Sequence, residues 1–281
     1  MIYMINLKSN YNRIFAFGCS YTRHIYATYA DIIASQYPNA TFINLGQSGS
    51  GNQLLLSRLS QTHRILNINE DDLVIIMYPS VTREDRWLPT GTWHTAGNIF
   101  NHKSSRNVTF NAFKFYKSYG SFLHYLIRDF AIIDMVENFL QNLTCDKILL
   151  TSTPLILGEE LNDGSLVLIE DDNIKHYNKL LKTYKDLLES YPIDYQTFFK
   201  VTYLNNGIPV GVKAGDDFDA HPSPIQALGY LKTIMNVNEL GVNYANRQEQ
   251  LINNCKSMED VKMIHRDYNT ELDKILQVKG F

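Results

Sequence analysis

The sequence predicts an α/β protein built on a doubly wound parallel sheet, and three of its features point that way. Short apolar segments alternate along the chain with longer segments that carry apolar residues at helical spacing. The short segments are apolar at nearly every position, as strands buried on both faces of a sheet are. The chain has 281 residues, of which 44% are hydrophobic, so it can bury a core of this size. Right-handed crossovers between such strands place helices on both faces.

The elements of this fold follow in chain order. The expected strands are Arg13–Phe17, Thr41–Asn44, Leu73–Tyr78 and Lys147–Ser152. The expected helices are Tyr21–Gln36, Asn52–Asn67, Phe113–Asn142 and Asn173–Ser190. Two insertions are expected, a long loop at Arg86–Asn111 and a turn-rich segment at Leu155–Asp172 around a short hairpin, Ser165–Ile169.

The composition changes near the end of the chain. From Val242 onward, charged and amide side chains dominate segments of helical character. We therefore expect residues 1–240 to form the α/β domain and residues 241–281 to form a C-terminal helical extension. Its amphipathic helices would dock on the body or on a second copy of the chain, which would make the protein a homo-oligomer.

Composition also excludes several classes of protein. The net charge of −3 and the lack of Lys/Arg clusters argue against nucleic-acid binding. No apolar run approaches the roughly 20 residues that span a bilayer, and the N-terminal segment lacks a signal-peptide core. The three cysteines are too few and too scattered for a disulfide framework or a zinc site. A soluble cytoplasmic protein without a membrane contact or a structural metal is expected.

The first candidate functional segment is Phe-Ala-Phe-Gly-Cys-Ser-Tyr-Thr, residues 15–22. An apolar strand reaches Gly18 and then places Ser20 before a segment of helical spacing. A strand that breaks at glycine and presents a serine is how α/β hydrolases expose a nucleophile. The alternative is a strand-to-helix turn in which Ser20 only caps the helix.

A second candidate segment, Gly46–Gly51, lies between an expected strand and an expected helix. Its three glycines allow backbone N–H groups to point inward, toward a phosphate or an oxyanion. The spacing matches neither the nucleotide P-loop nor the dinucleotide fingerprint. The alternative is a flexible loop in which Asn52 caps the next helix.

The third candidate segment surrounds His221. Ser223, Pro224 and Gln226 form a strong helix start, so His221 is held just outside a helix. Carboxylates precede it at Asp216, Asp217 and Asp219. A general base that is oriented by an acid needs this arrangement. The Ser20 turn, the Gly46–Gly51 loop and the loop after Tyr78 all follow expected strands, so a parallel sheet brings them to one edge, where His221 is also expected.

Together these segments resemble the SGNH (GDSL-like) hydrolase superfamily, particularly its branch that opens with Phe-Gly-Cys-Ser-Phe-Thr. The resemblance extends over about Arg13–Leu231. It implies a three-layer, flavodoxin-like fold and a reaction without a metal or an organic cofactor. It also implies that Ser20 is the nucleophile, His221 the base and Asp219 its orienting acid, with the N–H groups of Ser20 and Gly49 in the oxyanion hole.

The sequence departs from the family pattern in two places. The usual Gly-x-Asn-Asp block, whose Asn donates to the oxyanion, is replaced by Met-Tyr-Pro-Ser-Val-Thr-Arg-Glu at residues 77–84. This stretch resembles the variant Gln-Trp-Thr-Ser-x-x-Arg of the Phe-Gly-Cys-Ser branch, which implies that Ser80 is the replacement donor. The usual acid lies three residues before the histidine, where this chain has Phe218. Asp219 is favoured in its place, with Asp217 as the alternative.

Several other side chains are candidates for binding substrate. Trp87 and Trp93, with His94, could form a wall for a sugar ring, because aromatic faces suit pyranoses; ordinary loop packing is the alternative. Arg83 could bind a substrate carboxylate, or pair with Glu84 or Asp85 to steady its loop.

Three more residues near these motifs have competing interpretations. Asn52 is a further candidate substrate contact. Cys19 is expected to be a buried apolar residue rather than a rival nucleophile. His24 is expected to be an exposed helix residue.

The family resemblance implies a serine esterase that hydrolyses an acyl ester, with an O-acetyl group on a carbohydrate as the expected substrate. An O-acyltransferase that uses the same residues is the first alternative. A binding or assembly protein that has kept the fold without efficient chemistry is the second.

Overall fold

The core of the protein is a four-stranded parallel sheet. The computed structural model describes residues 5–81, 83–98, 121–152, 155, 174–190, 211–214, 216–219 and 221–263. The strands are β1 (Arg13–Phe17), β2 (Thr41–Asn44), β3 (Asp72–Tyr78) and β6 (Asp146–Thr151), in the order β2-β1-β3-β6. All four expected strands are present, two with the expected bounds and two shifted by one residue.

The strand order creates a switch in direction between β1 and β3. The chain leaves β1 to form β2 on one side and then crosses back to form β3 on the other. All seven residues of β3 are buried, as the centre of a sheet covered on both faces requires. Open α/β sheets bind ligands at the carboxyl ends of the strands beside such a switch. Ser20 follows β1 at this position.

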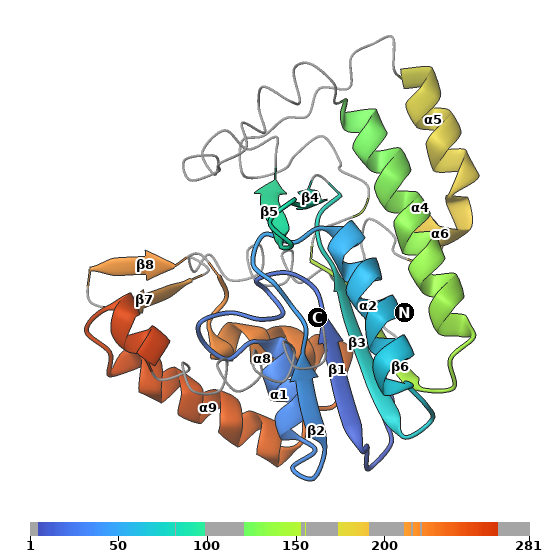
Figure 1. The fold of residues 1–281 in the computed structure, drawn as a ribbon. Helices are drawn as coiled ribbons and strands as arrows, with labels where there is room; N and C mark the ends of the chain where they lie inside the picture. Colours follow the sequence, from blue (N-terminus) through green and yellow to red (C-terminus); the bar gives the residue numbers. More distant parts are fainter. Residues whose placement is uncertain are drawn as a thin grey trace.

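Helices cover both faces of the sheet, which confirms the expected α/β architecture (Figure 1). One face packs against α2 (Asn52–Leu66), α4 (Phe122–Gln141), α5 (Ile174–Thr183) and α6 (Lys185–Ser190). The other face packs against α1 (Tyr29–Ser35), α8 (Pro224–Ile234) and α9 (Glu239–Asn253). Side chains in β1 and β3 alternate between the two cores; Phe15 and Phe17 face one, and Ile14 and Ala16 face the other.

The first helix begins later than expected, at Tyr29 instead of Tyr21. Thr28 is its N-cap, and the Asp31 carboxylate accepts hydrogen bonds from the Thr28 N–H and hydroxyl. The preceding residues have apolar and aromatic side chains at helical spacing, but Tyr26 is drawn toward Asp219 in a distant hairpin. Tertiary contacts therefore override the local pattern.

The other predicted helices differ less from the structure. The predicted helix Asn173–Ser190 is divided into α5 and α6 at Tyr184. The described part of the predicted helix Phe113–Asn142 begins at Phe122, and residues 113–120 lie outside the described residues, as does the predicted hairpin Ser165–Ile169.

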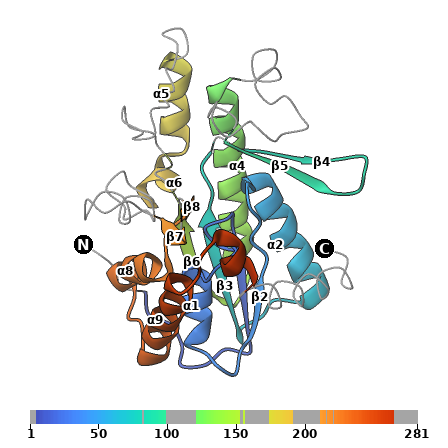
Figure 2. The ribbon, with the colours of Figure 1, turned by 90° about the vertical axis from the view of Figure 1, so that its left-hand side faces the viewer.

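The prediction of a long loop at Arg86–Asn111 is wrong for the first part of that range. Residues there form an antiparallel hairpin of β4 (Arg83–Trp87) and β5 (Trp93–Asn98), which projects from the body (Figure 2). The sequence of β4 does not show the alternation of apolar and polar residues that is typical of a strand, because its buried positions are the carboxylates Glu84 and Asp85. Residues 99–111 lie outside the described residues. A second short hairpin joins β7 (Val212–Ala214) to β8 (Asp217–Asp219).

The described part of the C-terminal extension packs on the body. Helix α9 contacts both α1 and α8. Ile252 near the end of α9 and Val261 beyond it complete a small core with Tyr26, Val212 and Ala214. Of the two predicted docking surfaces, the body of the same chain is thus the one observed. No helix in the described part of the chain is both long enough and apolar enough to cross a membrane.

Replacing Gly18 with alanine is expected to destabilise the protein by about 1–3 kcal/mol, the cost of overpacking a core. A Cβ at this position would overlap the Thr22 hydroxyl and lie 2.9 Å from the backbone oxygen of Met77. Both atoms are buried, and neither can move freely. Urea unfolding would measure the loss.

Gly229→Ala is the matched control for this substitution. Gly229 lies on the exposed side of α8, with no atom within 4 Å of the added Cβ. Alanine there is expected to raise the unfolding free energy by about 0.5–1 kcal/mol. Equal effects at the two glycines would contradict the close approach of β1 and β3.

Candidate active site

Ser20 lies in a tight turn directly after β1. The Cys19 carbonyl accepts hydrogen bonds from the N–H groups of Thr22 and Arg23, which closes the turn. The serine therefore precedes a loop rather than the first turn of a helix, and the alternative interpretation, in which Ser20 only caps a helix, is wrong. Ser20 is only 5% exposed, and the Cys19 side chain beside it is fully buried, as expected of an apolar packing residue.

The loop after β2 is joined to the turn that carries Ser20. The Gly18 carbonyl accepts hydrogen bonds from the Gln47 N–H, at 3.0 Å, and from the Ser50 hydroxyl, at 2.9 Å. These two contacts bring the candidate oxyanion loop to the candidate nucleophile, as expected for two neighbouring parallel strands.

Gly49 occupies a turn that favours glycine. The Ser50 N–H donates to the Gln47 carbonyl, and Gly49 at the third position of this turn has φ +74°, a value disfavoured for other residues. The β4–β5 hairpin lies against the loop, because the Gly97 N–H donates to the Gly49 carbonyl at 3.0 Å. This contact holds the loop through the carbonyl of Gly49.

His221 is held by the start of α8, as the sequence predicts. Ser223 is the N-cap and Pro224 the first helical residue, and the Ser223 and Gln226 side chains form a capping box. The rigid backbone that follows His221 limits the positions that its ring can take.

Ser20, His221 and Asp219 form a continuous hydrogen-bonded chain. The Ser20 Oγ lies 2.8 Å from Nε2 of His221, although the two residues are 201 positions apart. The Nδ1 of His221 lies 2.6 Å from Oδ1 of Asp219. The carboxylate accepts from Nδ1, so Nε2 is left free of a proton and can accept the Ser20 hydroxyl proton.

The carboxylate that orients His221 is Asp219, not the alternative Asp217. Asp217 is exposed, and its Oδ2 accepts the Met258 N–H at 3.1 Å. Burial alone would raise the pKa of Asp219, but hydrogen bonds from His221 and His24 outweigh burial and hold this pKa well below its ordinary value. Asp219 is therefore ionised throughout the neutral range.

His24 belongs to this group of residues, which the sequence did not indicate. Its side chain is 11% exposed, and its Nε2 lies 3.1 Å from Oδ2 of Asp219. Its ring stacks on that of His221, with centroids 4.0 Å apart and an interplanar angle of 29°. The prediction of an exposed helix residue is wrong because residues 21–28 form a loop that turns toward the β7–β8 hairpin.

A buried polar network supports the loop that carries Gly49. Asp85, which is 2% exposed, accepts the N–H groups of Gly51 and Leu54 at the start of α2. This carboxylate from a distant strand supplies the cap, so the N-cap residue is Gly51 instead of Asn52. Arg83 donates to the Ser50 carbonyl, so it steadies the loop through a backbone oxygen and not through the predicted pairing with Glu84 or Asp85.

Asn52 is part of the same network and lies below the surface. It is fully buried, and its Nδ2 donates to Oδ1 of Asp129 at 3.2 Å. Arg128 pairs with Asp129 at 2.9 Å and also with Glu84, which in turn pairs with Arg86. The burial leaves Asn52 no surface with which to contact a substrate, and it does not join the expected binding residues.

The stability of the protein is expected to decrease as the pH rises from about 4 to about 7. Burial raises the pKa of Asp129 to about 7, despite the opposing effect of Arg128. Between the ordinary pKa of an aspartate, about 4, and this value, the folded state binds more protons than the unfolded state, so raising the pH favours unfolding. One such group contributes at most about 1.4 kcal/mol per pH unit.

The variant Asp129→Asn is expected to show a smaller decrease over the same range, in urea unfolding at pH 5 and pH 7. The exposed Asp134 on the same helix is the matched control, and Asp134→Asn should retain the wild-type pH dependence. An unchanged slope in Asp129→Asn would mean that Asp129 stays ionised in the folded protein.

The remaining predicted binding residues lie around this edge of the sheet. Ser80 follows β3, next to β1, and is partly buried. Trp87 and Trp93 form a cross-strand pair with ring centroids 5.7 Å apart, next to the turn of the β4–β5 hairpin. Trp87 is 61% exposed. No interaction within the described residues links these tryptophans to Ser20, so their role in binding stays a prediction.

One group of described residues could in principle hold a metal ion. The ligand atoms of His24, Asp219 and His221 lie within 4.8 Å of one another. They already hydrogen-bond to each other at 2.6 and 3.1 Å, so an ion would have to displace these contacts.

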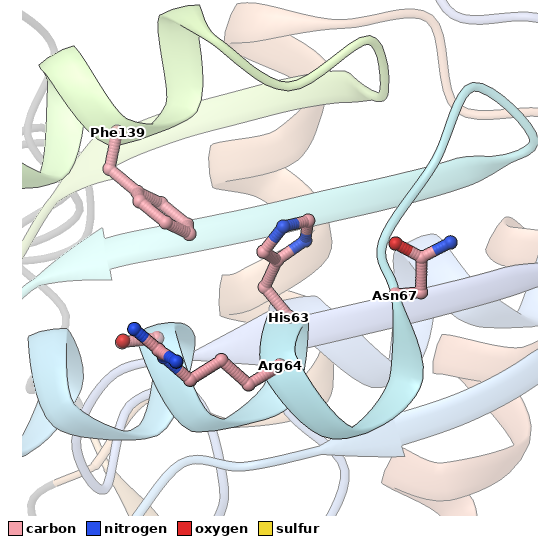
Figure 3. A pocket seen from close by; sticks show the side chains of 5 residues that line it. His63, Arg64, Asn67 and Phe139 are labelled. Carbon is pink, nitrogen blue, oxygen red and sulfur yellow. The ribbon is translucent and has the colours of Figure 1, made fainter.

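A separate pocket of about 410 Å³ opens at the C-terminal end of α2 (Figure 3). It is lined by Ser60, His63, Arg64, Asn67 and Phe139. The His63 ring lies between Phe139 and Asn67 in this view, with the Phe139 ring 5.5 Å away and edge-on. Helix α2 starts at the carboxyl ends of the strands, near Ser20, and runs back antiparallel to them. The pocket at its C-terminal end therefore lies at the opposite edge of the sheet, beside the amino ends of the strands.

The chain matches no protein-family model and no curated protein sequence. Among solved structures, it is similar to a lipolytic protein of the G-D-S-L family from Veillonella parvula, with 13% identity, a TM-score of 0.42 and coverage of 79% of this chain and 94% of that one. It is also similar to a GDSL-like lipase from Bacteroides thetaiotaomicron, with 14% identity, a TM-score of 0.34 and coverage of 86% and 87%. These identities leave little sequence in common with either protein.

Proposed function

We propose that this protein is a serine esterase of the SGNH type. The observation that carries the proposal is the hydrogen-bonded chain from Ser20 Oγ to His221 Nε2, at 2.8 Å, and from His221 Nδ1 to Asp219 Oδ1, at 2.6 Å. A nucleophile within hydrogen-bond reach of a base, and a base oriented by a third group, form the arrangement that activates a serine. A binding or assembly protein without ester chemistry would not need this geometry.

The reaction begins when Ser20 Oγ attacks the ester carbonyl carbon while His221 Nε2 takes the hydroxyl proton. The resulting imidazolium is stabilised by the ionised Asp219, which also holds the ring in the required tautomer. His221 then gives the proton to the departing alcohol, and an acyl-Ser20 ester remains. Water attacks this ester with His221 again as base, which releases the acid and restores the Ser20 hydroxyl.

The oxyanion that forms in each half of the reaction requires hydrogen-bond donors. We assign this role to the backbone N–H groups of Ser20 and Gly49, with the Ser80 hydroxyl as a third donor. Gly49 supports the assignment because its loop is tied to Gly18 beside the nucleophile, and its carbonyl is already used by Gly97. Ser80 supports it because it follows β3, the strand next to β1.

For the substrate we propose an O-acetyl ester, with a carbohydrate as the alcohol. The aromatic pair of the exposed Trp87 and the partly buried Trp93 on the β4–β5 hairpin is the feature that supports a sugar, since aromatic faces suit pyranose rings. The hairpin packs directly on the loop that carries Gly49, so a long substrate lying along it could reach the Ser20 edge.

The proposal is tested by labelling the protein with a fluorophosphonate probe and locating the modified residue by mass spectrometry. We expect covalent attachment at Ser20 and turnover of p-nitrophenyl acetate, both lost in Ser20→Ala. Cys19→Ser is the matched control, because its side chain is buried and its labelling should equal that of the wild type. Turnover that survives in Ser20→Ala would overturn the proposal. Transfer of the acetyl group to an added sugar, in preference to water, would instead identify an acyltransferase.

A further inference from the structure

The carboxylate of Asp219 is shared between two histidines. Its Oδ1 accepts the His221 Nδ1–H at 2.6 Å and the His221 backbone N–H at 2.8 Å. Its Oδ2 lies 3.1 Å from Nε2 of His24. Because an ionised carboxylate only accepts hydrogen bonds, the His24 proton must lie on Nε2. Each oxygen is thus held by a different ring, and the two bonds together determine the orientation of the carboxylate plane.

The rings of these two histidines also support each other. They are stacked with centroids 4.0 Å apart, and Tyr26 closes the other side of His24 with an edge-on contact at 4.6 Å. The Tyr26 hydroxyl donates to the His221 carbonyl at 2.8 Å. His221 is therefore restrained through its ring, its backbone and its carboxylate partner.

His24 has no space beside it for a substrate. The hollow that His24, Tyr26 and His221 line together with Ser20 has a volume of about 10 Å³. This is at most the room of a single water molecule. A substrate does not fit into this hollow, so we infer that it approaches Ser20 from another side and does not contact His24.

We propose that His24 is a positioning residue for the Ser20–His221–Asp219 group. Its Nε2–H fixes Oδ2 of Asp219, so that Oδ1 faces His221 Nδ1, and its stacked ring keeps His221 Nε2 directed at Ser20. The inference rests on the proposed esterase function.

The charge of His24 matters for this role. Burial lowers the pKa of His24, so its ring is neutral at neutral pH. A neutral ring can stack beside His221 when His221 takes the Ser20 proton, whereas a second positive charge 4.0 Å away would oppose that step. Among the described residues, the titratable groups that face His24 are Asp219, His221 and Tyr26.

Three substitutions separate the two contributions of His24. His24→Gln keeps an N–H donor but no ring, His24→Phe keeps a ring but no donor, and His24→Ala keeps neither. We expect kcat for p-nitrophenyl acetate to fall about 10–100-fold in His24→Ala, the usual cost of losing a group that orients a functional side chain, and by a smaller factor in His24→Phe, which keeps the stacked ring. His24→Gln should recover most of the loss, and KM should stay within about twofold of wild type throughout, because His24 does not contact substrate.

Two readouts distinguish positioning from a general structural role. The acid limb of the pH profile of kcat/KM should move in His24→Phe, since the hydrogen bond from His24 to Oδ2 of Asp219 is gone. The downfield proton resonance of the His221–Asp219 hydrogen bond should also move in His24→Phe and return toward its wild-type position in His24→Gln. The control is His63→Gln, a histidine at the opposite edge of the sheet, which should change neither.

Several results would overturn the positioning role of His24. An unchanged pH profile and an unchanged proton resonance in His24→Phe would exclude it, as would equal losses of kcat in His24→Gln and His24→Phe. Activity that depends on added Zn²⁺ and disappears with EDTA would mean that His24 binds a metal instead. The resonance can be measured whether or not the wild type hydrolyses esters, so failure of the proposed function and failure of this inference remain distinguishable.

Discussion

Replacing His221 with alanine is expected to reduce kcat for p-nitrophenyl acetate by about 10⁴–10⁶-fold, the range found when a member of a serine–histidine pair is removed from a hydrolase. Without the imidazole 2.8 Å from its Oγ, Ser20 has no base to accept its proton. The double variant Ser20→Ala/His221→Ala should lose little more than either single variant, because the two side chains act in the same step. Steady-state and burst-phase kinetics of the four proteins would measure both effects.

His176→Ala is the control for this comparison. His176 is an exposed residue of α5, on the other face of the sheet from α8, and its replacement should leave kcat within about twofold of wild type. Losses in the two single variants that multiply in the double variant would contradict a shared proton-transfer step. The esterase rate that remains in the double variant would then come from a nucleophile other than Ser20.

Asp219→Asn is expected to lower kcat by about 10⁴-fold, although asparagine has nearly the same shape. The amide can donate a proton toward His221 Nδ1 and so favours the tautomer in which Nε2 carries the proton. That tautomer cannot accept the proton of Ser20, and it cannot be stabilised as an imidazolium by a neutral neighbour. KM should change little.

Asp217→Asn is the matched control, two residues earlier on the same strand. Asp217 is exposed and contacts the Met258 N–H, so its replacement should leave kcat near the wild-type value. A loss as large as that of Asp219→Asn would contradict the assignment of the acid.

Asp219→Asn is also expected to change the stability of the protein in acid. The folded-state pKa of Asp219 lies below its ordinary value of about 4, so its contribution to stability is complete above that pH and is lost as the pH falls further. Asp219→Asn should flatten this acidic limb of the unfolding profile.

Local signals in the sequence predict much of this fold. The bounds of β1 and β2 are those expected, because buried parallel strands are recognisable as short apolar runs between turn residues. The start of α8 is also as expected, since the capping residues Ser223 and Gln226 are adjacent in sequence and need no distant partner.

The parts that could not be predicted depend on contacts between distant segments. His24 appears one turn into a helix by its local pattern, and only the position of Asp219 in a remote hairpin shows that it lies in a loop. Asp85 caps α2 from another strand, so Asn52 resembled the cap residue by position alone. The Gly46–Gly51 loop was recognisable from its glycines, whereas the hairpin that packs against Gly49 has polar residues where strands usually show apolar ones.

The small core around Tyr26 has a consequence for the order in which the proposed site is assembled during synthesis. Tyr26 follows Ser20 closely, but Ile252 and Val261, which pack around it, come more than 200 positions later. Ser20 and the sheet that carries it therefore leave the ribosome long before the segment that seats His221. A nascent chain holds Ser20 without His221, so under the proposed esterase function ester cleavage would start only after α9 and the segment that follows it have folded back onto the loop after Ser20.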